Sequence, residues 1–171
     1  MRTLLLLRHA KSGWDDPQLG DHERPLAKRG ARDAARIGDY LAKHDLVPDL
    51  VLCSDAVRTR ATLTIVLSRV EGAAPRIVYD RRLYLAEPDA IVAALAGVDA
   101  AAGRVMVIGH NPGMHALALG LTGSGSGKAL AHLALKFPTA GLAVIEFDVD
   151  GWDQLAAGQG ILRAFVTPKG L

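Results

Sequence analysis

Two stretches of the chain combine a histidine with groups that could bind or attack a phosphoryl group. Arg8 and His9 stand together near the N-terminus, and His110 lies far along the chain in the segment Gly109-His110-Asn111-Pro112. An arginine guanidinium is a planar fork that matches phosphate oxygens, and a neutral imidazole nitrogen can attack phosphorus. These residue types indicate phosphoryl-transfer chemistry, provided that the fold brings them to one place.

An apolar run that predicts a buried strand precedes each candidate group. The apolar runs, each given with the candidate residues that come after it, are Leu4–Leu7 with Arg8 and His9, Leu50–Cys53 with Arg58, and Val105–Ile108 with His110. Continuous apolar runs are typical of strands that are covered on both faces in a parallel sheet. The carboxyl ends of such strands meet at one sheet edge, where open α/β folds bind ligands. We therefore expect the two arginines and two histidines to surround one anion.

The rest of the chain alternates between predicted helices and strands. We expect helices over Leu26–His44, from an N-cap at Ser54 or Asp55 to about Arg69, over Pro88–Leu95 and over Met114–Leu121. Further strands are expected over Arg76–Tyr79, Leu142–Phe147 and Gly160–Val166, with an Asp150-Gly151 hairpin turn before the last, while Gly13–Pro25 and Thr122–Gly127 are predicted as loops. This order predicts an α/β fold: one domain over residues 1–171, a three-layer α/β/α sandwich with a mostly parallel central sheet and an antiparallel C-terminal edge. Gly30, inside the first helix, indicates close packing there.

Composition limits the class of protein. The chain has 171 residues, 22% of them charged, a net charge of +2 and one cysteine, Cys53. The small net charge argues against nucleic-acid binding, and no apolar run is long enough for a membrane span. A single cysteine excludes an internal disulfide and fits a reducing compartment, so we expect a cytoplasmic protein.

A metal site is the main competing interpretation of the histidines. They follow separate strands, without a carboxylate at ligand spacing, and neighbouring arginines would repel a cation. An anion site is therefore favoured over a metal site. The other histidines have no evident partner and are expected to be surface or structural: His22, His44, His115 and His132.

The sequence resembles the histidine phosphatase superfamily, the branch related to phosphoglycerate mutases, and most closely the short bacterial phosphohistidine phosphatases of the SixA type. The resemblance covers nearly the whole chain and is carried by Leu7-Arg8-His9-Ala10-Lys11-Ser12, Arg24-Pro25-Leu26 with Gly30, Ser54 with Arg58, Leu83-Tyr84, Gly109-His110-Asn111-Pro112, and Pro138-Thr139-Ala140-Gly141.

The resemblance implies a role for each of these positions. His9 would be the nucleophile that is transiently phosphorylated, and Arg8, Arg58 and His110 would hold the phosphoryl oxygens. No metal or organic cofactor would be required. Lys11 and Ser12 could add donors near the rim of the site. The implied substrate is phosphohistidine on another protein, such as a histidine-phosphotransfer or phosphocarrier protein. A small-molecule phosphomonoesterase, and an inactive phosphate-binding or scaffold protein, are the alternatives.

One position departs from the wider superfamily. Many members carry a glutamate, the general acid, two residues after the position of Leu83, and here that residue is Leu85. Glu87 is the nearest acidic side chain, and it could act as the acid only if the local backbone absorbed a shift of two residues. A missing acid is tolerable for phosphohistidine, because solvent can protonate its imidazole leaving group.

Overall fold

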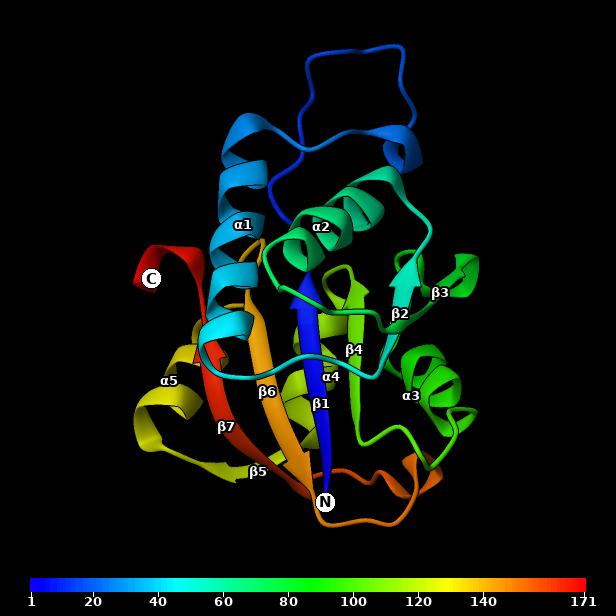
Figure 1. Ribbon diagram of the computed structural model, residues 1–171, viewed down its shortest axis with the longest axis vertical. Helices are drawn as coiled ribbons and strands as arrows, with labels where there is room; N and C mark the ends of the chain where they lie inside the picture. The colour runs from blue at the N-terminus through cyan, green and yellow to red at the C-terminus, as the bar shows by residue number, and fades with distance from the viewer.

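A seven-stranded sheet runs through the middle of the protein, which the computed structural model describes over residues 1–171 (Figure 1). Its strands lie in the order β3-β2-β4-β1-β6-β7-β5. They are β1 Arg2–Arg8, β2 Leu50–Ser54, β3 Arg76–Asp80, β4 Arg104–Gly109, β5 Thr122–Gly125, β6 Leu142–Phe147 and β7 Gly160–Val166. Strands β1 to β4 pair in parallel, and β6 pairs antiparallel with both β1 and β7. The predicted mostly parallel sheet with antiparallel pairing toward the C-terminus is confirmed.

Helices cover both faces of this sheet, which makes the predicted three layers (Figure 1). They are α1 Lys28–Lys43, α2 Val57–Ser68, α3 Pro88–Ala96, α4 Gly113–Leu121 and α5 Gly127–Leu135. Side chains of β1 alternate between the two apolar layers: Leu5 and Leu7 pack with the α1 and α2 side, Leu4 and Leu6 with the other. No helix has the length and apolar composition needed to cross a bilayer.

The first two helices begin later than the sequence predicts. Leu26 forms an isolated bridge with Ser12, so α1 starts at Lys28 instead of Leu26. Gly30 packs against the preceding loop as expected, since a Cβ there would lie 2.1 Å from the carbonyl oxygen of Lys11. Helix α2 is preceded by Ala56 and not by a Ser54 or Asp55 cap, because Ser54 still belongs to β2.

Predictions for the chain between β4 and β7 contain the clearest errors. The sequence predicts a loop over Thr122–Gly127, but its first four residues form the edge strand β5. Helix α5, which follows, is missing from the prediction. The Asp150-Gly151 hairpin is also wrong, because a longer connection with a short 3-10 helix joins β6 to β7. Trp152 in that connection is buried, and its indole Nε1 donates to the carbonyl of Ala102 at 2.7 Å. This tertiary contact anchors the longer connection, and local turn chemistry does not reveal it.

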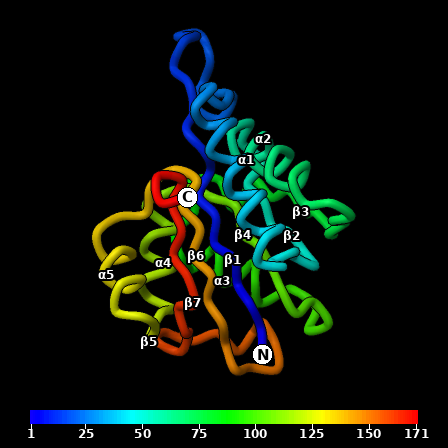
Figure 2. The backbone as a smooth tube through the Cα atoms, turned by 60° about the vertical axis from the view of Figure 1, so that its left-hand side comes forward, coloured from blue at the N-terminus to red at the C-terminus, as the bar shows by residue number.

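The connection between β1 and α1 projects beyond the carboxyl ends of the strands (Figure 2). Its outer part carries Trp14, which is 71% exposed, with the guanidinium carbon of Arg24 3.5 Å from the ring centroid. Its second part contains the short 3-10 helix Asp21–Glu23. This helix brings a carboxylate to the end of the sheet where the predicted site lies.

Candidate active site

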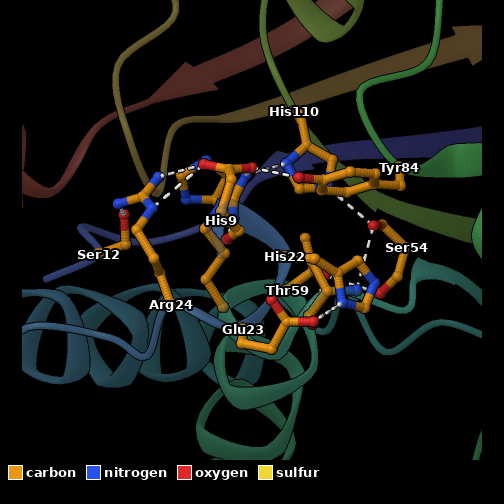
Figure 3. A network of polar contacts seen from close by, with 12 residues as sticks. His9, Ser12, His22, Glu23, Arg24, Ser54, Thr59, Tyr84 and His110 are labelled. Atoms are coloured by element: carbon orange, nitrogen blue, oxygen red, sulfur yellow. Dashed lines mark hydrogen bonds and ion pairs between the residues drawn. The ribbon is translucent and has the colours of Figure 1, made fainter. Parts of the chain in front are cut away.

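Three adjacent strands, β2, β4 and β1, deliver the predicted residues to one end of the sheet. Figure 3 shows His9, Ser54 and His110 among the side chains of this region. In the β1–β4 register Arg8 pairs with Gly109, so His9 and His110 follow their strands at the same level. Their ring centroids are 5.3 Å apart, and they are only 6% and 2% exposed. We refer to Arg8, His9, Ser54, Arg58 and His110 as the histidine cluster.

The His9 imidazole is held in one orientation. Its Nδ1 lies 2.8 Å from the carbonyl oxygen of Ala10, which can only accept, so Nδ1 carries the proton and Nε2 carries the lone pair. Burial lowers the pKa of His9 to about 4, and the charges of Arg58, Arg8 and Arg24 add to this effect. The ring is therefore neutral at pH 7, with an unprotonated Nε2 available for attack.

Helix α2 is tied directly to the end of β1. The backbone N–H of Ala10 donates to Thr62 Oγ1 at 3.0 Å, and the same hydroxyl donates to the carbonyl of Arg58 at 2.7 Å. Thr59 makes a similar link, because its hydroxyl donates to the carbonyl of Ser54 at 2.7 Å. These buried hydroxyls fix the first turn of α2, which carries Arg58 into the cluster.

His110 bridges β2 and α2. Arg58 Nη2 lies 3.3 Å from its Nδ1, and since a guanidinium can only donate, Nδ1 accepts. Its Nε2 then donates to Ser54 Oγ at 2.7 Å, so Ser54 orients this ring. Burial lowers the pKa of His110 to about 3, with the positive charges of His9, when protonated, and Arg58 acting in the same direction.

The two predicted arginines retain free donor capacity. Arg58 is 2% exposed, and Arg8 Nη1 donates to the carbonyl of Phe137 at 3.1 Å. The Nε–H groups of Arg8 and Arg58 are both buried without an acceptor in the protein. Burial and the nearby charge of Arg58 lower the pKa of Arg8. Two close, incompletely satisfied cations favour an anion as ligand.

Asp21 joins three other residues at the mouth of the cluster and was not predicted from the sequence. Arg58 donates to its carbonyl at 2.6 Å and to its Oδ2 at 2.9 Å, Arg24 donates to its Oδ1 at 3.0 Å, and the Tyr84 hydroxyl also donates to Oδ2. Burial alone would raise the pKa of Asp21, but the hydrogen bonds from Tyr84, Arg58 and Arg24 hold it well below the usual range. Arg24 and Tyr84 lie in motifs that the sequence singled out, whereas Asp21 carries no such signal.

The more weakly predicted residues lie around this cluster. Ser12 is buried and accepts from Arg24 Nη1 at 2.6 Å, while Lys11 is exposed and has no side-chain partner. Glu87 is exposed at the residue preceding α3, and its side chain makes no hydrogen bond. Leu85 is 52% exposed and has a φ of 51°. The structure therefore does not join Glu87 to the histidine cluster.

The histidines other than His9 and His110 lie outside the histidine cluster. His22 has a hydrogen-bond partner, although the sequence indicates none. Its Nε2 is 2.7 Å from Asp55 Oδ1, and its ring packs edge-on against Tyr84. His115 donates from Nε2 to the carbonyl of Leu133 at 2.6 Å. No group of three or more His, Cys, Asp or Glu side chains is arranged to hold a metal ion.

Comparisons with known proteins agree with this geometry. Residues 4–84 match the model of the histidine phosphatase superfamily (branch 1). The uncharacterized protein ML1117 of Mycobacterium leprae is 37% identical over 169 residues, covering 95% of this chain and 100% of that protein.

Two solved structures resemble the whole chain. The candidate phosphohistidine phosphatase SixA of Nakamurella multipartitia is 33% identical, with a TM-score of 0.84 and coverage of 98% of this chain and 96% of that one. Its counterpart from Agrobacterium tumefaciens is 32% identical, with a TM-score of 0.82 and 98% coverage of both chains. The chain therefore belongs to the histidine phosphatase superfamily and is SixA-like.

Proposed function

We propose that the protein hydrolyses phosphohistidine on another protein through a covalent intermediate on His9. The observation that carries the proposal is the buried, neutral His9 ring, whose Nδ1 is bound to the Ala10 carbonyl and whose Nε2 is left to react. Arg8 and Arg58, whose Nε–H groups have no acceptor in the protein, and His110, whose ring lies 5.3 Å from that of His9, are assigned to the phosphoryl oxygens; His110 would exchange its bond to Ser54 for one to the phosphoryl group. The activity needs no metal or cofactor in this scheme.

The reaction has two displacement steps. In the first, His9 Nε2 forms a bond to phosphorus while the bond to the substrate imidazole breaks, and that imidazole takes a proton from solvent. In the second, water attacks the phosphorus of phospho-His9, the P–N bond breaks, and inorganic phosphate leaves. Charge on the transferred group is stabilised by the fixed arginine donors, as phosphoryl transfer requires.

Absence of a positioned acid favours phosphohistidine over an alkyl phosphate. Leu85 is exposed, Glu87 is exposed and makes no hydrogen bond to the cluster, and Asp21 is held ionised by its hydrogen-bond donors. None of these can protonate an alkoxide in its present position. A substrate whose leaving nitrogen is protonated from water avoids this requirement.

Rapid-quench labelling tests the intermediate. The enzyme is mixed with ³²P-labelled phosphohistidine peptide and denatured in alkali, in which phosphohistidine survives. We expect label on the wild-type chain, none on His9→Ala, and wild-type labelling on His44→Ala, a matched loss of an exposed histidine. An unlabelled wild type would contradict the covalent mechanism, and label retained by His9→Ala would assign the nucleophile elsewhere.

The alternatives give different results in a substrate panel. A small-molecule phosphomonoesterase would turn over sugar phosphates faster than a phosphohistidine protein, and a phosphate-binding scaffold would show binding without label. We further propose that residues 1–171 act as one phosphatase domain and that its partner is a cytoplasmic phosphoprotein, in keeping with the single free thiol of Cys53.

A further inference from the structure

A second cationic region lies outside the histidine cluster. A cavity of about 770 Å³ is bounded by α1, α5 and the C-terminal end of the chain, which lie on the same side of the molecule in Figure 1. Five cationic side chains line it, together with a single carboxylate: Arg29, Arg32, Arg36, Lys136 and Lys169, with Asp33. The cavity thus has five positive side chains against one negative, whereas the whole chain has a net charge of only +2. We call this region the basic cavity.

The arginines form a regular row on α1. Positions 29, 32 and 36 recur at helical spacing, so the three side chains share one face over about 10 Å of helix. Asp33 lies 3.6 Å from Arg29, whereas Arg32 and Arg36 are exposed and make no hydrogen bond or ion pair in the protein. Arg32 and Arg36 therefore present unpaired charge to solvent.

The basic cavity shares a wall with the histidine cluster. Pro138 and Thr139 line the cavity, and they lie between two residues that contact the site. The carbonyl of Phe137 accepts from Arg8 Nη1 at 3.1 Å, and the N–H of Ala140 lies 3.0 Å from the carbonyl of His9. A partner that fills the cavity is therefore placed next to the catalytic end of β1.

We propose that the basic cavity is the docking site for an acidic segment of the phosphorylated partner protein. This proposal rests on the proposed function, and it specifies the partner: a protein that carries carboxylates near its phosphohistidine. A row of three arginines matches acidic residues at helical spacing, and a single phosphate would engage only part of it. Apolar groups of Leu135, Phe165 and Pro168 line the same cavity and can pack against aliphatic stems of the segment.

Synthetic phosphohistidine peptides of equal length test the proposal. One peptide has glutamates at helical spacing beside the phosphohistidine, a second has glutamines in their place, and free phosphohistidine serves as the small substrate. We expect the wild-type kcat/KM to be at least about tenfold higher for the acidic peptide than for the neutral one, with the difference in KM. Equal rates on the two peptides would overturn the docking site.

Two double variants test whether the preference for the acidic peptide arises at the basic cavity. Arg32→Glu/Arg36→Glu should abolish the preference for the acidic peptide and leave turnover of free phosphohistidine unchanged. Lys43→Glu/Lys128→Glu changes the charge equally at exposed positions outside the cavity, and it should keep the preference. A preference that survives in the first variant, or that is lost equally in the second, would contradict the proposal.

The two proposals fail in different ways. If the protein is not a phosphohistidine phosphatase, no peptide and no free phosphohistidine is hydrolysed. Docking is then still measured by fluorescence anisotropy of the labelled acidic peptide without its phosphate. Binding that Arg32→Glu/Arg36→Glu weakens and Lys43→Glu/Lys128→Glu does not would support the docking site alone. No binding, or binding of inorganic polyphosphate in strong preference to the peptide, would overturn it.

Discussion

The histidine cluster and the basic cavity are both cationic, and they differ in depth. Arg58 in the cluster is 2% exposed and bound to Asp21 and His110, whereas Arg32 and Arg36 in the cavity are exposed and unpaired. Charge in a buried site acts at low dielectric on a ligand of fixed shape, while exposed charge acts over a distance and is screened by salt. Depth therefore separates the site suited to chemistry from the surface suited to recognition.

The largest expected effect comes from removing the buried nucleophile. His9→Ala should reduce turnover of every substrate, peptide or small molecule, by at least about 10³-fold, because no other group can form the intermediate. Circular dichroism and thermal unfolding verify that the variant folds. Turnover within tenfold of wild type would place the chemistry outside the cluster.

Replacing one arginine in each region is a more direct contrast. Arg58→Ala should lower kcat/KM for p-nitrophenyl phosphate by about 10²–10³-fold, since a preorganised donor to the transferred group is lost. Arg32→Ala should leave this small substrate unaffected. Arg58→Lys serves as a second variant that keeps the charge without the planar fork, and it should still lose most activity. Equal effects of Arg58→Ala and Arg32→Ala would remove the distinction between the regions.

Acid should destabilise the protein through the buried histidines. The unfolded chain protonates these imidazoles below about pH 6.5, whereas in the folded protein the pKa values are about 4 for His9 and about 3 for His110. The unfolded state thus binds more protons in this window, and stability falls as the pH is lowered from 6.5 toward 4 by up to about 1.4 kcal/mol per pH unit for each histidine.

Urea unfolding at several pH values measures this slope. His110→Gln should reduce the slope by about half, because one of the two titrating groups is gone. His132→Gln, which removes an exposed histidine of the basic cavity, serves as the control for losing one imidazole. A wild-type stability that is flat between pH 6.5 and 4.5 would contradict the buried neutral state of the pair.

Salt should act on the cavity more than on the cluster. Raising NaCl from 50 to 500 mM should lower kcat/KM for the acidic phosphohistidine peptide several-fold, because exposed charges are screened beyond a few ångströms at this ionic strength. Free phosphohistidine should show a clearly smaller change, which steady-state kinetics on both substrates would measure. An identical salt dependence for the two would argue against an electrostatic role of the cavity.

The smallest expected effect is that of Glu87→Gln. Since the Glu87 side chain is exposed and makes no hydrogen bond, the variant should hydrolyse both good and poor leaving groups at nearly the wild-type rate. Wild-type activity on alkyl phosphates should already fall steeply as the leaving group worsens. A 10²–10⁴-fold loss confined to poor leaving groups, as roughly expected for lost acid catalysis, would instead identify Glu87 as the acid.

The sequence was most informative where strands are covered on both faces. The runs that end at Leu7, Cys53 and Ile108 are apolar throughout, and this pattern predicts buried strands in the middle of a sheet. By contrast, β5 has the sequence Thr-Gly-Ser-Gly and pairs only with β7, so its residues show no strand pattern. An edge strand of this kind is defined by its neighbour and not by its own side chains.

The same distinction applies to the site. Arg8, His9 and His110 could be grouped before the fold was known, because they follow strands whose ends must meet. Asp21 lies in an irregular loop without periodicity, and its contact with Arg58 depends on how that loop folds back over the sheet. Such contacts join residues far apart in the chain, and no local pattern encodes them.

The single cysteine provides a chemical reporter for the opening of the sheet. Cys53 is 0% exposed in β2, directly before the serine that accepts from His110, and burial raises the pKa of its thiol to about 12. Alkylating and disulfide reagents attack the thiolate, so they reach Cys53 only when β2 separates from its neighbours. The rate of alkylation therefore measures how often β2 separates from the strands that carry His9 and His110, without any label added to the protein.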